Sequence, residues 1–138
     1  MSDTVNVLIV DDMKFVHDPI KKFLQNFVFP GSKLSITNAY NLTQAKRKIG
    51  EHKYDLVMLD GEVGGSWGYE IIPNIREHNE RVAIISVSNY SGFNSRNVKM
   101  GSDGAVNKIH LYDWNDKTGV IKKRKGKMVR QIFERKNG

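Results

Sequence analysis

The chain contains three short and nearly continuous apolar runs: VNVLIV at 5–10, DLVMLD at 55–60 and VAIISV at 82–87. All three are rich in Val, Ile and Leu, and none alternates cleanly between apolar and polar residues. This pattern is typical of strands that are covered on both faces in a parallel sheet. Two weaker runs, at 33–40 and 104–108, predict strands at the edges of the same sheet.

The segments between these runs carry helical patterns, because apolar side chains recur there at spacings of three or four residues. The positions are Val16, Ile20, Leu24 and Phe27, then Leu42, Ala45 and Ile49, and then Ile71, Ile72 and Ile75. Strand and helix therefore alternate along the chain. This order predicts an α/β fold with a doubly wound parallel sheet of five strands and helices on its faces.

Two prolines disagree locally with this map, because Pro19 and Pro73 fall inside presumed helices. Proline in a helix interior costs about 3 kcal/mol, whereas the first turn tolerates it. Each proline predicts either a kink or a later helix start. For the first helix, Asp18 as N-cap and Pro19 as first helical residue remain an open alternative.

Composition limits the class of protein. The 138 residues are 39% hydrophobic and 27% charged, which predicts one globular domain over 1–138, and the chain contains no cysteine. No apolar run is long enough to span a bilayer and no signal segment stands at the start, so we expect a cytoplasmic protein. The formal charge of +7 lies almost wholly in a basic C-terminal segment, 117–138, with 9 Lys or Arg against Glu134 alone.

Chemically useful side chains stand where the predicted strands end. Asp11 and Asp12 end the first run, Asp60 the second, Ser86 lies near the end of the third and Lys108 ends the last. The working groups of a doubly wound sheet lie at the carboxyl ends of its strands, so these groups should converge. Clustered carboxylates need a cation, and hard oxygen ligands suit Mg²⁺. A carboxylate can also attack phosphorus, with lysine and serine side chains holding the phosphoryl oxygens.

The segments VLIVDD, YDLVMLD, IISVS and GAVNK resemble the signature segments of response regulator receiver domains (CheY-like) of two-component systems. The resemblance implies a flavodoxin-like sheet with strand order 2-1-3-4-5 and Asp60 as the phosphoacceptor. It also implies a Mg²⁺ site in which Asp12, Asp60 and the backbone carbonyl of Glu62 bind the metal directly. Asp11 would assist through water.

The same resemblance implies roles for the remaining residues. Ser86 and Lys108 become the switch pair, and Glu62 and Ser88 occupy the positions that tune loss of the phosphoryl group. The phosphoryl group would come from a histidine kinase or a phosphotransfer protein. Phosphorylation would remodel a face that binds a downstream protein, as in a population shift between two states. Such a domain catalyses only its own phosphorylation and dephosphorylation and is not otherwise an enzyme.

The chain departs from the family pattern at two places that bear on the site. The aromatic residue usually found three places before the lysine is replaced by Ala105, so any aromatic contribution to signalling is absent. After Asp60 the chain reads GEVGG at 61–65, which predicts a flexible loop.

The C-terminal segment supports two interpretations. Met128, Val129, Ile132 and Phe133 form an apolar stripe that predicts packing, and Gly126 predicts either a break in this helix or a hairpin turn. The KKRKGK run at 122–127 instead suggests contact with nucleic acid or an acidic partner. The four histidines show no metal-ligand spacing and are interpreted as structural or surface residues.

Three functions compete at this stage. The first is a stand-alone phosphorylated switch without an attached output domain. The second is a receiver-like binding module that works without phosphorylation through the basic run at 122–127. The third is a Mg²⁺-dependent phosphohydrolase with an aspartate nucleophile, which usually has a second acid two residues after the first. The DDMK sequence at 11–14 lacks that pattern.

Overall fold

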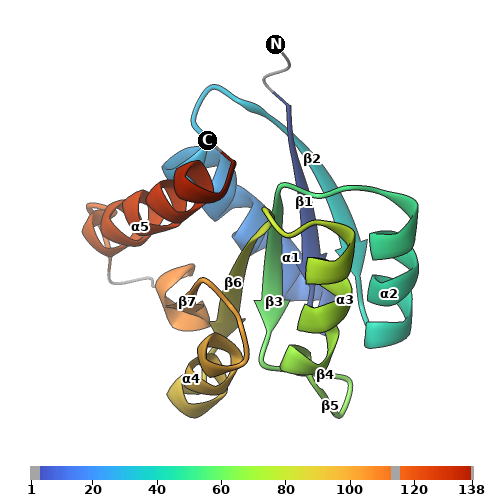
Figure 1. The fold of residues 1–138 in the computed structure, drawn as a ribbon. Coiled ribbons are helices and arrows are strands. Elements are labelled where there is room, and N and C mark those ends of the chain that lie inside the picture. The colour runs from blue at the N-terminus through green and yellow to red at the C-terminus, as the bar shows by residue number, and fades with distance from the viewer. Residues whose placement is uncertain (1–3, 113–115, 138) are drawn as a thin grey trace.

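A computed structural model describes residues 4–112 and 116–137 of the chain (Figure 1). Its centre is a parallel sheet of five strands in the order β2-β1-β3-β6-β7. The strands are β1 (Thr4–Val10), β2 (Lys33–Ala39), β3 (Leu56–Asp60), β6 (Ala83–Ser88) and β7 (Gly104–Asn107). Among these five the order is 2-1-3-4-5, as predicted, and the two weaker runs form the edge strands.

Helices cover both faces of this sheet. They are α1 (Lys14–Phe23), α2 (Leu42–Glu51), α3 (Ile72–His78), α4 (Ser91–Lys99) and α5 (Val120–Asn137). A π-helix, η1 (Leu24–Val28), extends α1, while the 3₁₀ turns η2 (Gly68–Ile71) and η3 (Lys108–His110) precede α3 and follow β7. In Figure 1, α2 and α3 lie on one side of the sheet, and α1 and α5 lie on the other.

Two apolar cores fill the space between the sheet and its helices. On one face, Ile85 and Val87 of β6 join the cluster that includes residues of α1 and α5. On the other face, Ile84 joins the cluster built with α2 and α3. Successive side chains of a strand point to opposite faces, so both faces of the central strands are apolar. The near-continuous hydrophobic runs of the sequence have this cause.

The structure resolves both proline alternatives. Helix α1 begins at Lys14 and includes Pro19, so the later start at Asp18 is wrong. Burial of Val16, Ile20 and Phe23 against the sheet stabilises the helix, although Pro19 has no backbone N–H to donate to the preceding turn. Pro73 instead lies in the first turn of α3, where no amide hydrogen bond is needed, and this helix does start late.

Helix α5 runs unbroken through Gly126, which lies against the end of η1. A Cβ atom at this position would stand 2.2 Å from the carbonyl oxygen of Phe27. The glycine therefore permits close approach of two backbones and neither breaks the helix nor turns a hairpin. The predicted packing of the apolar stripe is confirmed, because Met128, Val129, Ile132 and Phe133 all join the core.

Helix α5 is also the longest helix of the described part of the chain. No helix within residues 4–112 and 116–137 combines the length and apolar character that crossing a bilayer requires.

Candidate functional site

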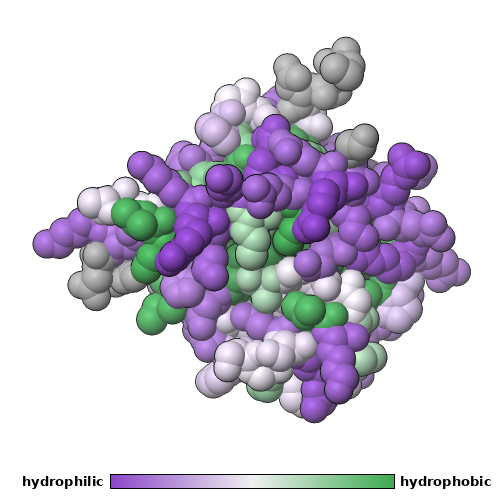
Figure 2. Space-filling view, turned by 60° about the vertical axis from the view of Figure 1, so that its left-hand side comes forward, coloured by the Kyte–Doolittle hydropathy of each residue, from purple (hydrophilic) through white to green (hydrophobic). Residues whose placement is uncertain are grey.

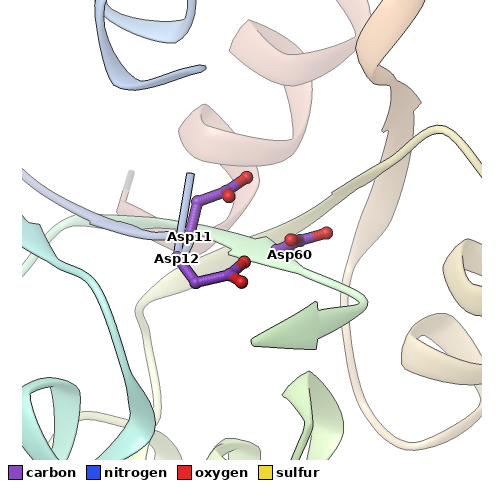
Figure 3. Close-up of side chains that lie close together, drawn as sticks. All are labelled: Asp11, Asp12 and Asp60. Atoms are coloured by element: carbon purple, nitrogen blue, oxygen red, sulfur yellow. The ribbon is translucent and has the colours of Figure 1, made fainter. Parts of the chain in front are cut away.

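Three carboxylates meet at the carboxyl end of the sheet. Asp11 and Asp12 follow β1, and Asp60 is the last residue of the neighbouring strand β3. One oxygen from each carboxylate lies within 4.8 Å of the others. Figure 3 shows Asp11 and Asp12 on consecutive residues with the Asp60 side chain beside them. Asp11 and Asp60 are buried, whereas Asp12 is exposed.

Lys108 brings a positive charge into this cluster. It is the first residue of η3, directly after the edge strand β7, and its side chain is buried. Its Nζ lies 2.7 Å from Asp11 Oδ2 and 3.2 Å from Asp60 Oδ2. Burial alone lowers the pKa of this ammonium, but the hydrogen bonds and charges of Asp11 and Asp60 outweigh burial and raise it. Lys108 is therefore a permanent cation between two acids.

One lysine does not neutralise three carboxylates. Burial, and then the negative charge of Asp11, raise the pKa of Asp60 from 3.8 to about 7, although Lys108 and the Gly61 amide act in the opposite direction. In the absence of another cation, Asp60 is therefore partly protonated near neutral pH. A divalent cation among these oxygens would favour the ionised form of all three acids.

The remaining oxygens of the cluster are suited to a hard metal ion. Asp11 Oδ1 accepts a hydrogen bond from the Met13 amide (2.9 Å), and Asp60 Oδ1 accepts one from the Gly61 amide (2.7 Å). These bonds orient the two carboxylates, while Asp12 remains exposed to solvent. Carboxylate oxygens with room for water are the ligand set that Mg²⁺ prefers. The residues present thus fit the predicted metal.

The acidic cluster opens into a cavity of about 250 Å³. Its lining residues are Asp12, Met13, Asp60, Glu62, Ser88, Asn89, Tyr90, Phe93 and Lys108. Acidic, hydroxyl and ammonium groups form its polar part, and aromatic side chains form its rim. The phosphoacceptor predicted from the sequence therefore has a polar cavity beside it that a small anionic group can enter.

The segment after Asp60 differs from the prediction. The GEVGG sequence was expected to form a flexible loop, but β4 (Glu62–Val63) and β5 (Ser66–Trp67) form an antiparallel hairpin. Its two central residues, Gly64 and Gly65, have φ values of 57° and 84°. A two-residue turn with positive φ at both positions matches the twist of a hairpin, and glycine adopts it without steric strain. The hairpin holds Glu62 at the cavity.

Two predicted site residues, Asp11 and Ser86, do not line this cavity. Asp11 still contacts Lys108 of the cluster, whereas Ser86 makes its contacts elsewhere. Its hydroxyl is fully buried and donates to Asn94 Oδ1 (2.6 Å) of α4. It also accepts from Asn97 Nδ2 (2.9 Å) of the same helix. Ser88 lies in the cavity instead, and its Oγ accepts from the Tyr90 amide (3.2 Å). The structure thus brings together all the other predicted site residues and holds Ser86 toward α4.

The parallel register explains the position of Ser86. Asp60 pairs with Val87, and side chains of paired residues point to the same face, so Ser86 points to the opposite face. Ser86 itself pairs with Ala105 of β7, the position at which the family usually has an aromatic residue. The small alanine side chain lies beside the serine hydroxyl, and α4 supplies the polar partners.

Sequence reasoning missed three residues that contact the site. Asn94 and Asn97 are the buried residues of α4. Because they are polar, the apolar spacing that predicts a helix is absent from this segment. His17 of α1 is also buried, and its Nε2 lies 2.8 Å from the backbone oxygen of Asp11. Its Nδ1 lies 2.6 Å from Asn38 Oδ1. A lone histidine in an amphipathic helix gives no sequence signal for such a contact.

Comparison with known proteins agrees with this geometry. The family model described as the response regulator receiver domain matches residues 7–110. The transcriptional regulatory protein MalR of Bacillus subtilis is 33% identical over 87 residues, which cover 61% of this chain and 34% of that protein. The transcriptional regulatory protein YvrH of the same organism is 32% identical over 78 residues, covering 56% and 31%. The matched part is therefore about a third of each curated relative.

Solved structures show the same fold. Response regulator TrrA of Thermotoga maritima, solved in complex with Mg(2+)-BeF, is 28% identical with a TM-score of 0.66, covering 91% of this chain and 98% of that one. The signal receiver domain of an HD domain-containing protein of Pseudomonas fluorescens has a TM-score of 0.74 at 14% identity, covering 99% and 91%. Because the family model matches most of the chain, residues 7–110, the chain belongs to the response regulator receiver domain family.

Proposed function

We propose that this receiver domain accepts a phosphoryl group on Asp60 in a Mg²⁺-dependent reaction. The observation that carries the proposal is the Asp60 carboxylate, which lies in an open polar cavity with two further acids and one ammonium around it. The Mg²⁺ would be held by Asp12, Asp60 and the backbone carbonyl of Glu62, with Asp11 acting through water. A relative, TrrA, was solved in complex with Mg(2+)-BeF, which supports Mg²⁺ as the metal.

The proposed reaction transfers phosphorus between two nucleophiles. An Asp60 carboxylate oxygen forms a bond to phosphorus while the P–N bond of a phosphohistidine donor breaks, and the departing imidazole takes a proton from water. The metal would stabilise the charge on the phosphoryl oxygens and favour ionised Asp60. Lys108 is already within 3.2 Å of the Asp60 carboxylate and would bind a phosphoryl oxygen.

Two further residues are positioned to affect the lifetime of the aspartyl phosphate. Glu62 and Ser88 both line the cavity that water must enter to hydrolyse it. We propose that they tune dephosphorylation, as the family resemblance implies. Ser86 would complete the switch pair with Lys108 only after its hydroxyl leaves α4.

The partners follow from this chemistry. The phosphodonor would be a histidine kinase or a phosphotransfer protein, and the output a changed surface for a downstream protein. We propose that residues 1–138 form one receiver domain with 117–138 as an extended basic segment, and that it works in the cytoplasm. Its catalysis would be limited to its own phosphorylation and dephosphorylation.

The alternative of nucleic-acid binding through 122–127 is not favoured. This run occupies the start of α5, which packs on the core through its apolar stripe, and Lys123, Arg124 and Lys127 point to solvent. Figure 2, in which the side bearing α5 comes forward, shows a mostly hydrophilic face with separate hydrophobic patches. A solvated helix face explains these charges. The acidic site is meanwhile complete, and a phosphorylation-independent module would not require it.

Intact mass spectrometry tests the proposal. The chain would be incubated with acetyl phosphate and either Mg²⁺ or EDTA, with the variants Asp60→Asn and Asp18→Asn in parallel. Asp18 is an exposed aspartate paired with Lys22 in α1, which makes it a matched control. Wild type and Asp18→Asn should gain one phosphoryl group only with Mg²⁺, and Asp60→Asn should gain none. A gain by Asp60→Asn, or no gain by wild type, would overturn the proposal.

A further inference from the structure

The buried side of α4 facing the site is polar. Asn94 and Asn97 are its buried residues, and Asn97 is only 1% exposed. With Ser86 they form a hydrogen-bonded group at the back of the acidic site, which we call the amide clasp (Ser86, Asn94 and Asn97). Buried amides are uncommon on helix faces unless hydrogen bonds satisfy them, so these contacts determine how α4 packs.

The directions of the hydrogen bonds in the amide clasp are fixed by their surroundings. Asn94 Nδ2 donates to the backbone oxygens of Ser88 (3.2 Å) and Val106 (3.3 Å), which leaves Asn94 Oδ1 toward Ser86. The Ser86 hydroxyl must therefore donate to Asn94, and its oxygen is free to accept from Asn97 Nδ2. One serine hydroxyl thus has both a donor and an acceptor partner on α4.

Asn97 also connects α4 to the strand that carries the phosphoacceptor. Its Nδ2 lies 3.5 Å from the backbone oxygen of Asp60 as well as 2.9 Å from Ser86 Oγ. Within the described part of the chain, its Oδ1 has no hydrogen-bond partner although it is buried. Asn97 is therefore held by contacts on one side of its amide alone, and those contacts are with Ser86 and Asp60.

A surface groove lies beside the amide clasp. It has a volume of about 480 Å³ and runs between α4 and β7, and Asn94, Val98 and Ala105 contribute to its lining. Ala105 is also the strand partner of Ser86, and Asn94 contacts both this groove and the Ser86 hydroxyl. The two asparagines are therefore the contacts of α4 that a displaced Ser86 would lose.

We propose that Asn94 and Asn97 are positioning residues that hold the Ser86 hydroxyl away from Asp60 and thereby oppose the switch. The proposal rests on the proposed phosphorylation of Asp60. It adds the two residues that oppose the switch. Because Ser86 gives up two hydrogen bonds to reach a phosphoryl group, the amide clasp favours the unphosphorylated state.

A double-mutant cycle on beryllofluoride binding tests this role. The affinity for beryllofluoride with Mg²⁺ would be measured by tryptophan fluorescence, since Trp67 pairs with Glu62 of the site hairpin. Asn97→Ala should raise the affinity by roughly 2- to 10-fold, the equivalent of one net hydrogen bond. In a Ser86→Ala background the same change should have no effect. Ser95→Ala, at an exposed position on α4, should leave the affinity unchanged.

Equal tightening by Asn97→Ala with and without the Ser86 hydroxyl would overturn the proposal, and so would weaker binding. Asn97→Leu, which keeps the side-chain size, serves the same cycle if the alanine variant unfolds. A second cycle, on the free energy of unfolding without Mg²⁺ or beryllofluoride, should show coupling between Ser86 and Asn97. Zero coupling would mean that the amide clasp does not stabilise the unphosphorylated state. Failure of wild type to bind beryllofluoride would instead contradict the proposed phosphorylation.

Discussion

At the carboxyl-terminal end of β6, the two faces of the strand differ in the contacts that hold them. On one face Ile85 and Val87 pack into the apolar core that includes α5. On the other face Ser86 is hydrogen-bonded to two asparagines of α4, and Ser88 lies in the cavity beside Asp60. At this end of the strand, successive residues therefore make non-directional apolar contacts on one face and directional polar contacts on the other.

This difference predicts that the two sides of the strand differ in how strongly they depend on the charge of the acidic site. Apolar packing does not depend on charge, so the contacts on the α5 side should change little when the charge of the acidic site changes. Hydrogen bonds and ion pairs can exchange partners when a charged group arrives. The polar side should therefore respond to pH, Mg²⁺ and phosphorylation, while the α5 side should not. The following changes test that contrast.

Removal of the Lys108 charge should have the largest effect. Lys108→Met leaves Asp11 and Asp60 buried without their cation, which should lower the free energy of unfolding by about 4 kcal/mol near pH 8 without Mg²⁺. The loss should be smaller near pH 5, because Asp60, with a pKa raised to about 7, is then largely protonated. Urea unfolding at both pH values measures this. Lys99→Met, an exposed lysine on α4, is the control, and equal losses for both variants would refute the charge argument.

A change on the α5 side should be nearly as costly but insensitive to conditions. In Gly126→Ala the added Cβ would stand 2.2 Å from the carbonyl oxygen of Phe27, which should cost about 3 kcal/mol as α5 moves away. The loss should be the same with and without Mg²⁺. Gly50→Ala in α2 has open space around it and should instead stabilise the protein by up to about 1 kcal/mol. A harmless Gly126→Ala would contradict the close contact.

Asp60 should make stability depend on pH in the opposite sense to most carboxylates. Its folded pKa of about 7 lies above its ordinary value of 3.8, so the native state binds the proton more tightly than the unfolded state. Stability should therefore fall as pH rises from about 4 to about 7. Without Mg²⁺, Asp60→Asn should be about 2 kcal/mol more stable than wild type near pH 8. Urea unfolding of both proteins at several pH values between about 4 and about 8 measures this. A wild type whose free energy of unfolding rises relative to that of Asp60→Asn as pH increases would contradict the prediction.

Truncation on each face should give the smallest but most direct contrast. Val129→Ala removes buried methyl groups from the α5 side and should cost about 2 kcal/mol. Asn97→Ala removes one net hydrogen bond together with an unpartnered acceptor and should cost about 1 kcal/mol or less. Thermal unfolding of both variants measures the difference. A larger loss for Asn97→Ala would mean that α4 is a structural support and not a switchable contact.

Much of the architecture could be predicted because it depends on apolar periodicity. The five long strands, their edge or central positions and the packing of α5 all follow from that pattern. The acidic cluster was predictable as well, since Asp11, Asp12 and Asp60 stand where neighbouring parallel strands end. Helix α4 gave no such signal, because its buried face consists of Asn94 and Asn97.

The side to which Ser86 points could not be predicted, because it depends on register. Pairing of Asp60 with Val87 places the serine on the opposite face, and a shift of one residue would reverse this. The close contact at Gly126 depends on a tertiary approach between α5 and η1, which a local pattern does not contain. Likewise, only the fold brings His17 to the backbone of Asp11.

A crystal structure of the chain with Mg²⁺ and beryllofluoride would test the central claim most directly. The quantity to measure is the position of Ser86 Oγ relative to the group on Asp60. The account predicts that the hydroxyl is within hydrogen-bonding distance of beryllofluoride and has left both Asn94 and Asn97. A structure in which Asp60 carries beryllofluoride while Ser86 remains bonded to both asparagines would contradict it.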